Sequence, residues 1–320
     1  PPLPDLATHG IDTVDLSGLA SLQAACGRVL AAGRIDDEDA AVIRSALDGT
    51  VLECASGQSL AVRYLAGEGF IMRAVGPARM PVVGPRSTGM NDHGGATSVH
   101  ADQDVFGTPL AQLMDGRAPE LFRHDSPDGA NRDADLMLVN LWIPLRQVVQ
   151  PLVLADGTSI DRPRHQLRFG LPTASFLERD EDMEINDIWA FLHDDGQRWY
   201  FRSDLDHLSA WVFDTLSTPH GAGVLPGEAV ARQCLEGLDT TAVGGEDTSR
   251  VLADAARAGI PPGTPPGLCD AVAALQDLCA VAADDPGAAR SPDWTAAVAP
   301  ARERVVRRSL EMRLVVSLLD

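Results

Sequence analysis

Lysine is absent from this 320-residue chain, so all 26 of its basic residues are arginine. Acidic residues number 46, and the formal net charge is −20. A chain this acidic is repelled by phosphate backbones and by anionic membrane surfaces. The composition therefore predicts that the protein binds neither nucleic acid nor a membrane.

Cysteine is scarce, and the five cysteines form no C-x-x-C pair. An odd, scattered set argues against a disulfide framework and against a cysteine-based zinc site, and it fits free thiols in a reducing compartment. Residues 1–5 have neither a basic region nor an apolar run, so we expect no signal peptide. We expect no membrane-spanning helix, because no apolar segment approaches the roughly 20 residues that span a bilayer. These absences predict a soluble, cytoplasmic protein.

Several catalytic signatures are missing as well. The chain has no G-x-S-x-G, no phosphate-binding P-loop and no G-x-G-x-x-G. The segment Gly221-Ala222-Gly223 lacks the third glycine and the strand context of a dinucleotide site. Serine hydrolases of the nucleophile-elbow type, P-loop nucleotide hydrolases and Rossmann enzymes are therefore disfavoured.

Two helices are predicted near the N-terminus. Apolar residues recur at helical spacing over 19–30, and the acids of 36–39 suit the start of a second helix that ends near Gly49. Short β-like segments follow at 51–54, 60–64 and 70–75. We assign residues 1–90 to N-terminal helices with flanking strands.

The middle of the chain predicts β-structure. The nearly continuous apolar run 135–145 is typical of a buried central strand, which Pro144 would close. Residues 106–132 mix proline, glycine and charge and predict a loop over the site. Short strands with turns at regular intervals indicate a sandwich or barrel, and they are expected at 150–157, 188–191 and 199–202. We assign 91–227 to a double-stranded β-helix, or jelly-roll, core.

The composition changes after Gly227. Three segments, 228–240, 247–258 and 267–283, are rich in alanine and leucine, and their apolar residues recur at helical spacing. We therefore predict a helical insertion over 228–299, placed before the last strand. The whole chain is expected to be mainly β with helices.

Within the last segment, 300–320, apolar residues occupy every second position over 309–318. Leu310, Met312 and Leu314 share one face of a strand, and Ser309, Glu311 and Arg313 share the other. This pattern predicts that the chain returns to the β core as its final strand.

His100 and Asp102 carry the clearest chemical signal. Residues i and i+2 of a strand leave the same face with Cα atoms roughly 6.5–7 Å apart, so both side chains can converge on one ion. A second histidine would complete the two-His, one-carboxylate triad of non-haem Fe(II) oxygenases, which leaves coordination positions open. His220 is the candidate, because the interval after Asp102 has room for the strands of a jelly roll. We predict that these three residues are catalytic and bind a metal ion.

Other histidines compete for this role. His193-Asp194-Asp195 is a second H-x-D, but it lies in a predicted turn and too close to His220 for several strands to intervene. His93, beside two glycines, is a substitute ligand should His100 not bind. The alternative for the whole motif is a surface strand with an incidental polar pair.

Further segments keep a fixed order around these residues. They are Val99-His100-Ala101-Asp102, 139–145, 151–159, Arg198-Trp199-Tyr200, Ser203-Asp204, Thr218-Pro219-His220 and 308–313. In this order and spacing the chain resembles the iron- and 2-oxoglutarate-dependent oxygenases that include the cephamycin C-7 hydroxylase component and the fungal gibberellin-desaturase-like and aspergillic-acid-hydroxylase-like proteins. The resemblance spans most of 97–225 and the final strand.

The resemblance implies Fe(II) at the triad, 2-oxoglutarate as cosubstrate, and O2 and a small metabolite as the other partners. Arg313 on the final strand would pair with the distal carboxylate of 2-oxoglutarate, which a guanidinium fork suits, ahead of Arg307 and Arg308. Ser309 and Asn140 are further candidate cofactor-binding residues.

The aromatic residues of the matching segments are candidates for the substrate. Trp142, Trp199 and Tyr200 would line its pocket, with aromatic core packing as the alternative. Oxidation of an unactivated C–H in specialised biosynthesis is the reaction implied, whether hydroxylation, desaturation or ring formation. A homo-oligomer is compatible with the sequence.

The chain also departs from the family pattern. Family members pass quickly from the distal histidine to the final strand, whereas here the helical insertion intervenes, and Gly221-Ala222-Gly223 stands where a bulkier pair is usual. Three alternatives therefore stay open. They are an Fe(II) oxygenase that needs no 2-oxoglutarate, a zinc hydrolase with the same triad, and a non-catalytic jelly-roll binding protein.

Overall fold

The computed structural model describes residues 3–66, 69–84, 88–96, 98–146, 148–172, 185–203, 205–243 and 247–319. Thr97 and Asp204, which belong to the segments discussed above, lie outside the described residues.

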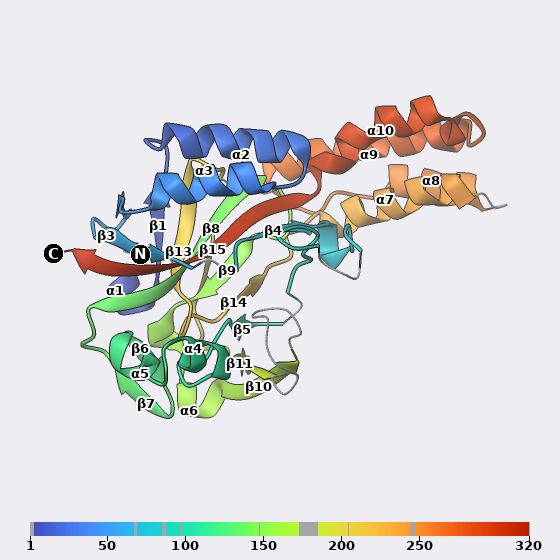
Figure 1. The fold of residues 1–320 in the computed structure, drawn as a ribbon. Coiled ribbons are helices and arrows are strands. Elements are labelled where there is room, and N and C mark those ends of the chain that lie inside the picture. Colours follow the sequence, from blue (N-terminus) through green and yellow to red (C-terminus); the bar gives the residue numbers. More distant parts are fainter. Residues whose placement is uncertain are drawn as a thin grey trace.

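Two antiparallel sheets form the body of the protein (Figure 1). The seven-stranded sheet has the order β1 (Ile11–Asp15), β13 (Ser209–Asp214), β8 (Leu136–Arg146), β15 (Arg307–Leu319), β3 (Ser59–Leu65) and β2 (Val51–Glu53), and β4 (Ile71–Val75) also pairs with β15. The six-stranded sheet has the order β10 (Gln166–Pro172), β11 (Ile185–Phe191), β5 (His100–Ala101), β14 (His220–Ala222), β9 (Leu152–Ala155) and β12 (Trp199–Phe201). Neighbouring strands are mostly distant in the chain, and the strand-rich, nearly closed arrangement is consistent with the predicted jelly roll.

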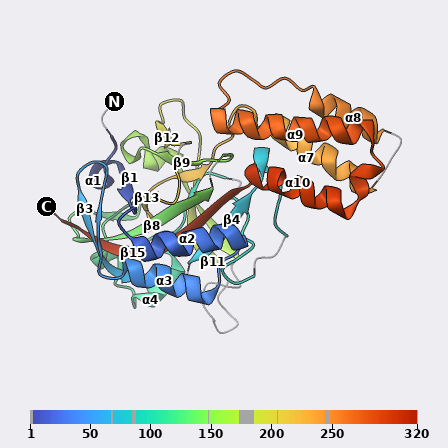
Figure 2. The same ribbon diagram turned by 90° about the horizontal axis from the view of Figure 1, so that it is seen from above.

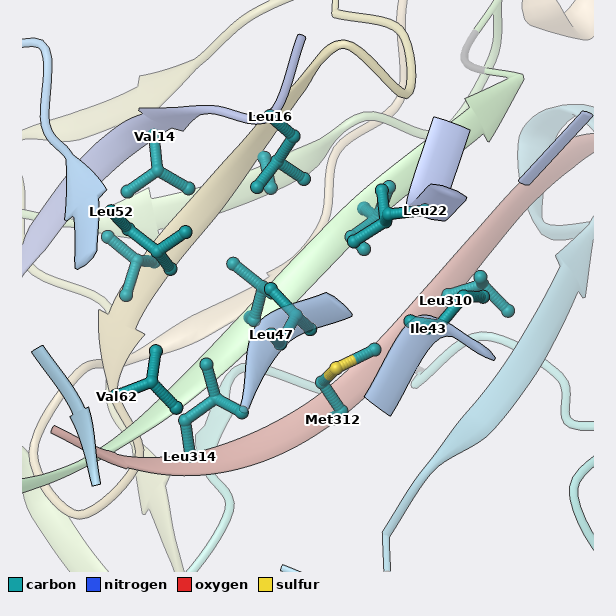
Figure 3. Close-up of a cluster of buried hydrophobic side chains, with 14 of the residues drawn as sticks. Val14, Leu16, Leu22, Ile43, Leu47, Leu52, Val62, Leu310, Met312 and Leu314 are labelled. Atoms are coloured by element: carbon teal, nitrogen blue, oxygen red, sulfur yellow. The ribbon is translucent and has the colours of Figure 1, made fainter. Parts of the chain in front are cut away.

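Both faces of the larger sheet are buried, but against different partners. The outer face of β15 carries Leu310, Met312 and Leu314, which pack under the helices together with Leu22, Ile43 and Leu47 (Figure 3). The inner face meets the smaller sheet through a cluster that includes Trp142, Phe213, Leu152 and Leu154. The final strand returns to the β core, as predicted, and its alternating pattern places its polar residues between the two sheets.

Helices α2 (Ala20–Ala32) and α3 (Asp37–Leu47) cover the outer face of this sheet (Figure 2). Asp36 caps α3, since its carboxylate accepts from the Asp39 N–H, and Gly33 ends α2 with a φ of 70°. The prediction of two N-terminal helices is confirmed. Each fully buried leucine under them contributes about 1.5–3 kcal/mol to stability.

A separate helical block follows β14 and projects beside the sheets (Figure 2). It consists of α7 (Glu228–Val243), α8 (Thr248–Ala256), α9 (Pro266–Asp284) and α10 (Pro292–Arg304). Its own apolar core includes Leu235, Leu252, Leu275 and Cys279. Helical spacing thus predicted α7, α8 and α9 correctly. It did not identify α10, which extends to Arg304 and so into the segment 300–320 that was assigned to the final strand; β15 begins only at Arg307.

Among the described residues, α9 is long and apolar enough, by length and composition alone, to cross a membrane. The expectation that no segment is long and apolar enough to cross a membrane is therefore wrong for α9, in which Asp270 and Asp277 interrupt the apolar run. One side of α9 is buried in the helical block through Leu268, Val272 and Leu275. A core helix of this kind passes the same test of length and hydropathy.

Two predictions about the middle of the chain are wrong. Pro144 does not end its strand: β8 continues to Arg146, and Pro144 pairs with Ser309 where the register with β15 shifts. A β-bulge tolerates a residue that has no N–H to donate. The expected loop 106–132 instead contains α4 (Thr108–Leu113), α5 (Ala118–Leu121), β6 (His124–Ser126) and β7 (Gly129–Asn131).

Burial of a few apolar side chains, rather than the overall composition, explains why the segment 106–132 forms helices and strands. Leu110, Ala118 and Phe122 pack in a small apolar cluster with Leu138 of β8 and Leu216. The sequence analysis also missed β1 and β13, since such short strands carry little periodicity. The remaining short helices are α1 (Leu6–His9), η1 (Pro77–Arg79), η2 (Gly157–Ser159), α6 (Arg162–His165) and η3 (Ala288–Arg290).

Candidate metal centre

The structure brings His100, Asp102 and His220 together. His100 lies on β5 and His220 opens β14, and the two residues are direct partners across these neighbouring strands. Asp102 follows β5, and its Oδ1 lies 3.3 Å from His100 Nε2 and 3.5 Å from His220 Nε2. One ligand atom from each residue lies within 4.8 Å of the others. Two strands that are distant in the chain thus present three ligand atoms to one point.

Each histidine is fixed by its other ring nitrogen. His100 Nδ1 lies 3.0 Å from the carbonyl of Ser98, and His220 Nδ1 lies 3.1 Å from the carbonyl of Thr218. Because a carbonyl can only accept, each Nδ1 carries the proton and donates it. Each Nε2 then directs a lone pair towards the centre of the cluster, as metal-binding histidines do.

Asp102 is oriented by its second oxygen. Its Oδ2 accepts a hydrogen bond from Asn140 Nδ2, and Arg313 Nη2 lies 3.7 Å away. Asn140 is held in turn by Thr215, whose hydroxyl donates to Asn140 Oδ1 over 3.0 Å. Asn140 therefore contacts the candidate metal ligand directly, and Oδ1 of Asp102 remains directed at the two histidines.

The pKa values of the cluster favour a cation at its centre. Burial alone would raise the pKa of Asp102, but His220, His100 and Arg313 hold it well below its ordinary value. Burial also disfavours charge on His100, and the Asp102 carboxylate more than offsets this and raises the pKa of His100. A divalent cation would take the place of the proton that this arrangement attracts.

The donor set fits an open-site metal ion. Two imidazole nitrogens and one carboxylate oxygen occupy one side of an ion and leave positions for other ligands, the arrangement that Fe(II) oxygenases use. Zinc accepts the same donors in hydrolases. The three residues alone therefore define a metal centre and not its reaction.

A small cavity of about 20 Å³ adjoins the histidines. Besides His100 and His220 it is lined by Trp142, Arg73, Arg307 and Glu311, together with Ala96, Leu152, Phe213, Gly221 and Ala222. A larger cavity of about 620 Å³ shares Ala96 with it and has mainly apolar walls. The metal centre thus lies beside a polar recess and an apolar space.

Arg307 is the buried cation of the small cavity, with 3% of its surface exposed. Its Nη1 donates to the carbonyl of Gln150 over 2.6 Å, and its guanidinium carbon lies 5.5 Å from the centre of the Trp142 ring. Its Nε has no hydrogen-bond partner among the described residues. Burial lowers the pKa of Arg307 to about 10. A buried guanidinium with a free donor is costly unless an anion meets it.

Ser309 lies two residues further along the same face of β15. It is fully buried, and its Oγ also has no partner among the described residues. Glu311, the next residue on this face, is paired with Arg73 at 2.8 Å and accepts from Trp142 Nε1 at 3.1 Å. On this face of β15, Arg307 Nε and Ser309 Oγ are thus donors without a hydrogen-bond partner among the described residues.

The predicted site residues are distributed unevenly around this centre. Trp142 lines the small cavity, whereas Arg313 lies beside Asp102 and does not line it. Tyr200 packs against the apolar cluster that joins the sheets, and Trp199 lies beside it on β12; neither lines the two cavities described above. His93 lines the larger cavity, with Nε2 bonded to the carbonyl of Gly89.

Among the described residues, the second H-x-D motif belongs to no such cluster. The side chain of His193 is 81% exposed, and it lies in the turn between β11 and β12. Sequence reasoning missed Arg73 and ranked Arg307 below Arg313. The signal for Arg307 was present, because it shares the strand phase of Ser309 and Arg313.

Comparisons with known proteins give limited information. No protein-family model and no curated protein matches the sequence. Two solved structures of the iron and alpha-ketoglutarate-dependent endoperoxidase NvfI are similar to it. One covers 98% of this chain and 80% of its own at 13% identity, with a TM-score of 0.46; the other, in a different conformation, covers 98% and 78% at 14% identity, with a TM-score of 0.48. At these values the likeness carries no argument about this chain.

Proposed function

We propose that the protein is a non-haem Fe(II) oxygenase that uses 2-oxoglutarate to oxidise a small metabolite in specialised biosynthesis. The observation that carries the proposal is the pairing of two features. A two-His, one-carboxylate cluster, with the Nδ1 of each histidine bonded to a carbonyl, adjoins the recess that Arg307 lines. Arg307 Nε and the buried Ser309 Oγ have no hydrogen-bond partner among the described residues. The first feature suits Fe(II), and the second suits the carboxylate of a cosubstrate.

The proposal assigns the distal carboxylate of 2-oxoglutarate to Arg307 and Ser309 rather than to Arg313. Arg307 and Ser309 are both buried with unused donors, whereas Arg313 lies against Asp102. A bound carboxylate would neutralise the Arg307 charge and accept from both Nε and Oγ. The cost of burying this guanidinium is then offset by its ligand.

Fe(II) and 2-oxoglutarate, when bound, supply the activation of O2. The residues of the chain bind and orient. His100, Asp102 and His220 hold the metal, Asn140 keeps the Asp102 carboxylate in place, and Trp142 and Phe213 keep water away from the recess. The larger cavity, whose walls are mainly apolar, is the proposed place for a cytoplasmic metabolite with a hydrocarbon body.

The first test is anaerobic titration of the protein with Fe(II), with and without 2-oxoglutarate. We expect one Fe(II) per chain and a visible charge-transfer band that requires 2-oxoglutarate. Oxygen uptake should then depend on 2-oxoglutarate and yield succinate. Full oxygen uptake with substrate but without succinate would instead favour the oxygenase that needs no cosubstrate, and a chain that binds no iron would favour a binding protein.

Two variants test the assignment of the arginines. Arg307→Gln should raise the 2-oxoglutarate concentration for half-saturation by about tenfold or more, since a charge-assisted hydrogen bond is worth roughly 1.5–3 kcal/mol. Arg313→Gln should mainly weaken Fe(II) binding, because Arg313 faces Asp102. The opposite pattern would return the cosubstrate to Arg313.

A further inference from the structure

Glu228, the first residue of α7, is a fully buried carboxylate. Its Oε1 accepts from the backbone N–H groups of Gln150 and Leu225 at 2.8 and 2.9 Å. Its Oε2 accepts from the Ala78 N–H and from Gln150 Nε2, both at 2.7 Å. Four donors from three segments therefore converge on one side chain of the helical block.

Two of these donors belong to strained backbone. Gln150 and Ala78 both have a φ of 47°, in the left-handed region that disfavours residues with a Cβ. Such a residue is strained and persists only when its surroundings hold it. Here the Glu228 carboxylate supplies that hold, because it accepts from both N–H groups.

The backbone of Gln150 connects Glu228 to Arg307, which lines the recess beside the metal centre. The Gln150 N–H points to Glu228, and its carbonyl accepts from Arg307 Nη1 over 2.6 Å. Among the described residues, this carbonyl is the one group that accepts a hydrogen bond from the Arg307 guanidinium. The conformation of Gln150 therefore sets where Arg307 stands over Trp142.

We infer that Glu228 is a positioning residue for the anion-binding Arg307, acting through Gln150. The inference rests on the proposed role of Arg307 towards 2-oxoglutarate. It gives the helical block a role in the reaction, since α7 contributes the carboxylate that fixes the cosubstrate site. A purely structural clamp would affect stability and leave the affinity for the cosubstrate unchanged.

Glu228→Gln is the informative variant because it keeps the shape of the side chain. An amide retains one accepting oxygen, and its NH2 would face N–H donors that now lack an acceptor. In this variant the left-handed conformation of Gln150 loses some of the hydrogen bonds that stabilise it. The Gln150 carbonyl can then rotate away from Arg307. Glu303→Gln is the matched control, since Glu303 also joins the helical block to the sheet but pairs with Arg146 and Arg308.

The experiment uses the full chain loaded with Mn(II), and calorimetry measures the Kd of Mn(II) and then that of 2-oxoglutarate. For Glu228→Gln we expect 2-oxoglutarate to bind about tenfold more weakly. The Kd of Mn(II) should stay within about twofold of the unaltered protein. Glu303→Gln should leave both values unchanged.

The outcomes separate this inference from the proposed function. If the unaltered protein does not bind 2-oxoglutarate, the proposed cosubstrate is wrong and the inference falls with it. If the unaltered protein binds it and Glu228→Gln binds it equally well, the inference alone is overturned. Should Glu228→Gln fail to fold, Glu228→Asp decides: it keeps the charge but cannot reach Ala78 and Gln150 together. A 2-oxoglutarate affinity that is unchanged in that variant, or that falls only in step with the Mn(II) affinity, would overturn the inference.

Discussion

At the scale of single residues, Asp102 shows how a metal ligand is prepared by its neighbours. Its Oδ1 faces two histidines, and its Oδ2 is held by Asn140 and approached by Arg313. Such outer partners orient a ligand before the ion arrives and tune how strongly it binds. Asn140 is therefore as much a determinant of the metal centre as the ligands themselves.

Asn140→Ala should weaken Fe(II) binding by roughly 10–100-fold, the usual effect of losing an outer hydrogen bond to a metal ligand. Thr215→Val should weaken it less, because Thr215 acts only through Asn140. Anaerobic competition with a metal chelator measures both affinities. Iron binding unchanged in Asn140→Ala would show that Arg313 alone orients Asp102.

Asp214 provides a residue-scale test of pH dependence. It is 6% exposed, and burial raises its pKa to about 6. Its unfolded pKa is about 3.9, so the native state holds the proton more tightly than the unfolded state does. The free energy of unfolding therefore decreases as the pH rises from about 4 to about 6, by up to about 3 kcal/mol at roughly 1.4 kcal/mol per pKa unit.

Asp214→Asn removes this dependence, since an amide does not ionise. We expect the variant to be more stable than the unaltered protein at pH 8 and little different at pH 4. Urea unfolding of the two metal-free proteins at both pH values measures the difference in their free energies of unfolding. The other acidic residues are the same in both proteins, so their contributions cancel in this difference. A variant that is less stable at pH 8 would mean that the charged carboxylate is stabilised by Arg162 more than burial disfavours it.

At the scale of elements, α7 begins at a point of close contact. Gly227 has a φ of 93°, and a Cβ there would lie 2.6 Å from Thr264 Cγ2 in the α8–α9 connection. Only glycine adopts this conformation without strain. The start of α7, and with it the position of Glu228, therefore depends on a residue without a side chain.

Gly227→Ala should destabilise the protein by about 1–3 kcal/mol, through backbone strain and the clash with Thr264. It should also weaken 2-oxoglutarate binding, because Glu228 is the next residue. Gly259→Ala is the control, since no atom lies within 4 Å of a Cβ built there. Thermal unfolding and calorimetry check the two effects, and equal behaviour of both variants would contradict the expectation.

At the scale of the whole molecule, charge is the dominant property. With 26 basic and 46 acidic residues the chain repels itself in the compact state. Salt screens such repulsion, with a Debye length of about 10 Å at 0.1 M. The Tm should therefore rise as sodium chloride increases from about 0.01 M to about 0.15 M. Calorimetric scans of the metal-free protein test this, and a Tm that falls would show that paired charges outweigh the net repulsion.

The sequence by itself determined the local features of this protein. Apolar residues at every second position over 309–318 specified a strand with one apolar face, because a strand has a side-chain period of two. Helical spacing specified α2, α3, α7, α8 and α9, and the spacing of His100 and Asp102 predicted that their side chains converge, although Asp102 lies just after β5. These features depend on residues that are close together in the chain, so sequence periodicity and capping residues predict them directly.

Only the tertiary structure decided which distant residues meet. It placed β5 beside β14, so that His220 faces His100, and it placed Arg307 rather than Arg313 in the recess beside the histidines. It also joined Glu228 to Gln150. The polar face of β15 offers two arginines of equal local pattern, Arg307 and Arg313, and only strand pairing and burial distinguish them. Sequence periodicity gives the face of the strand from which each side chain projects. Which residue that side chain contacts depends on the register of the strand and on where the opposite sheet packs against it.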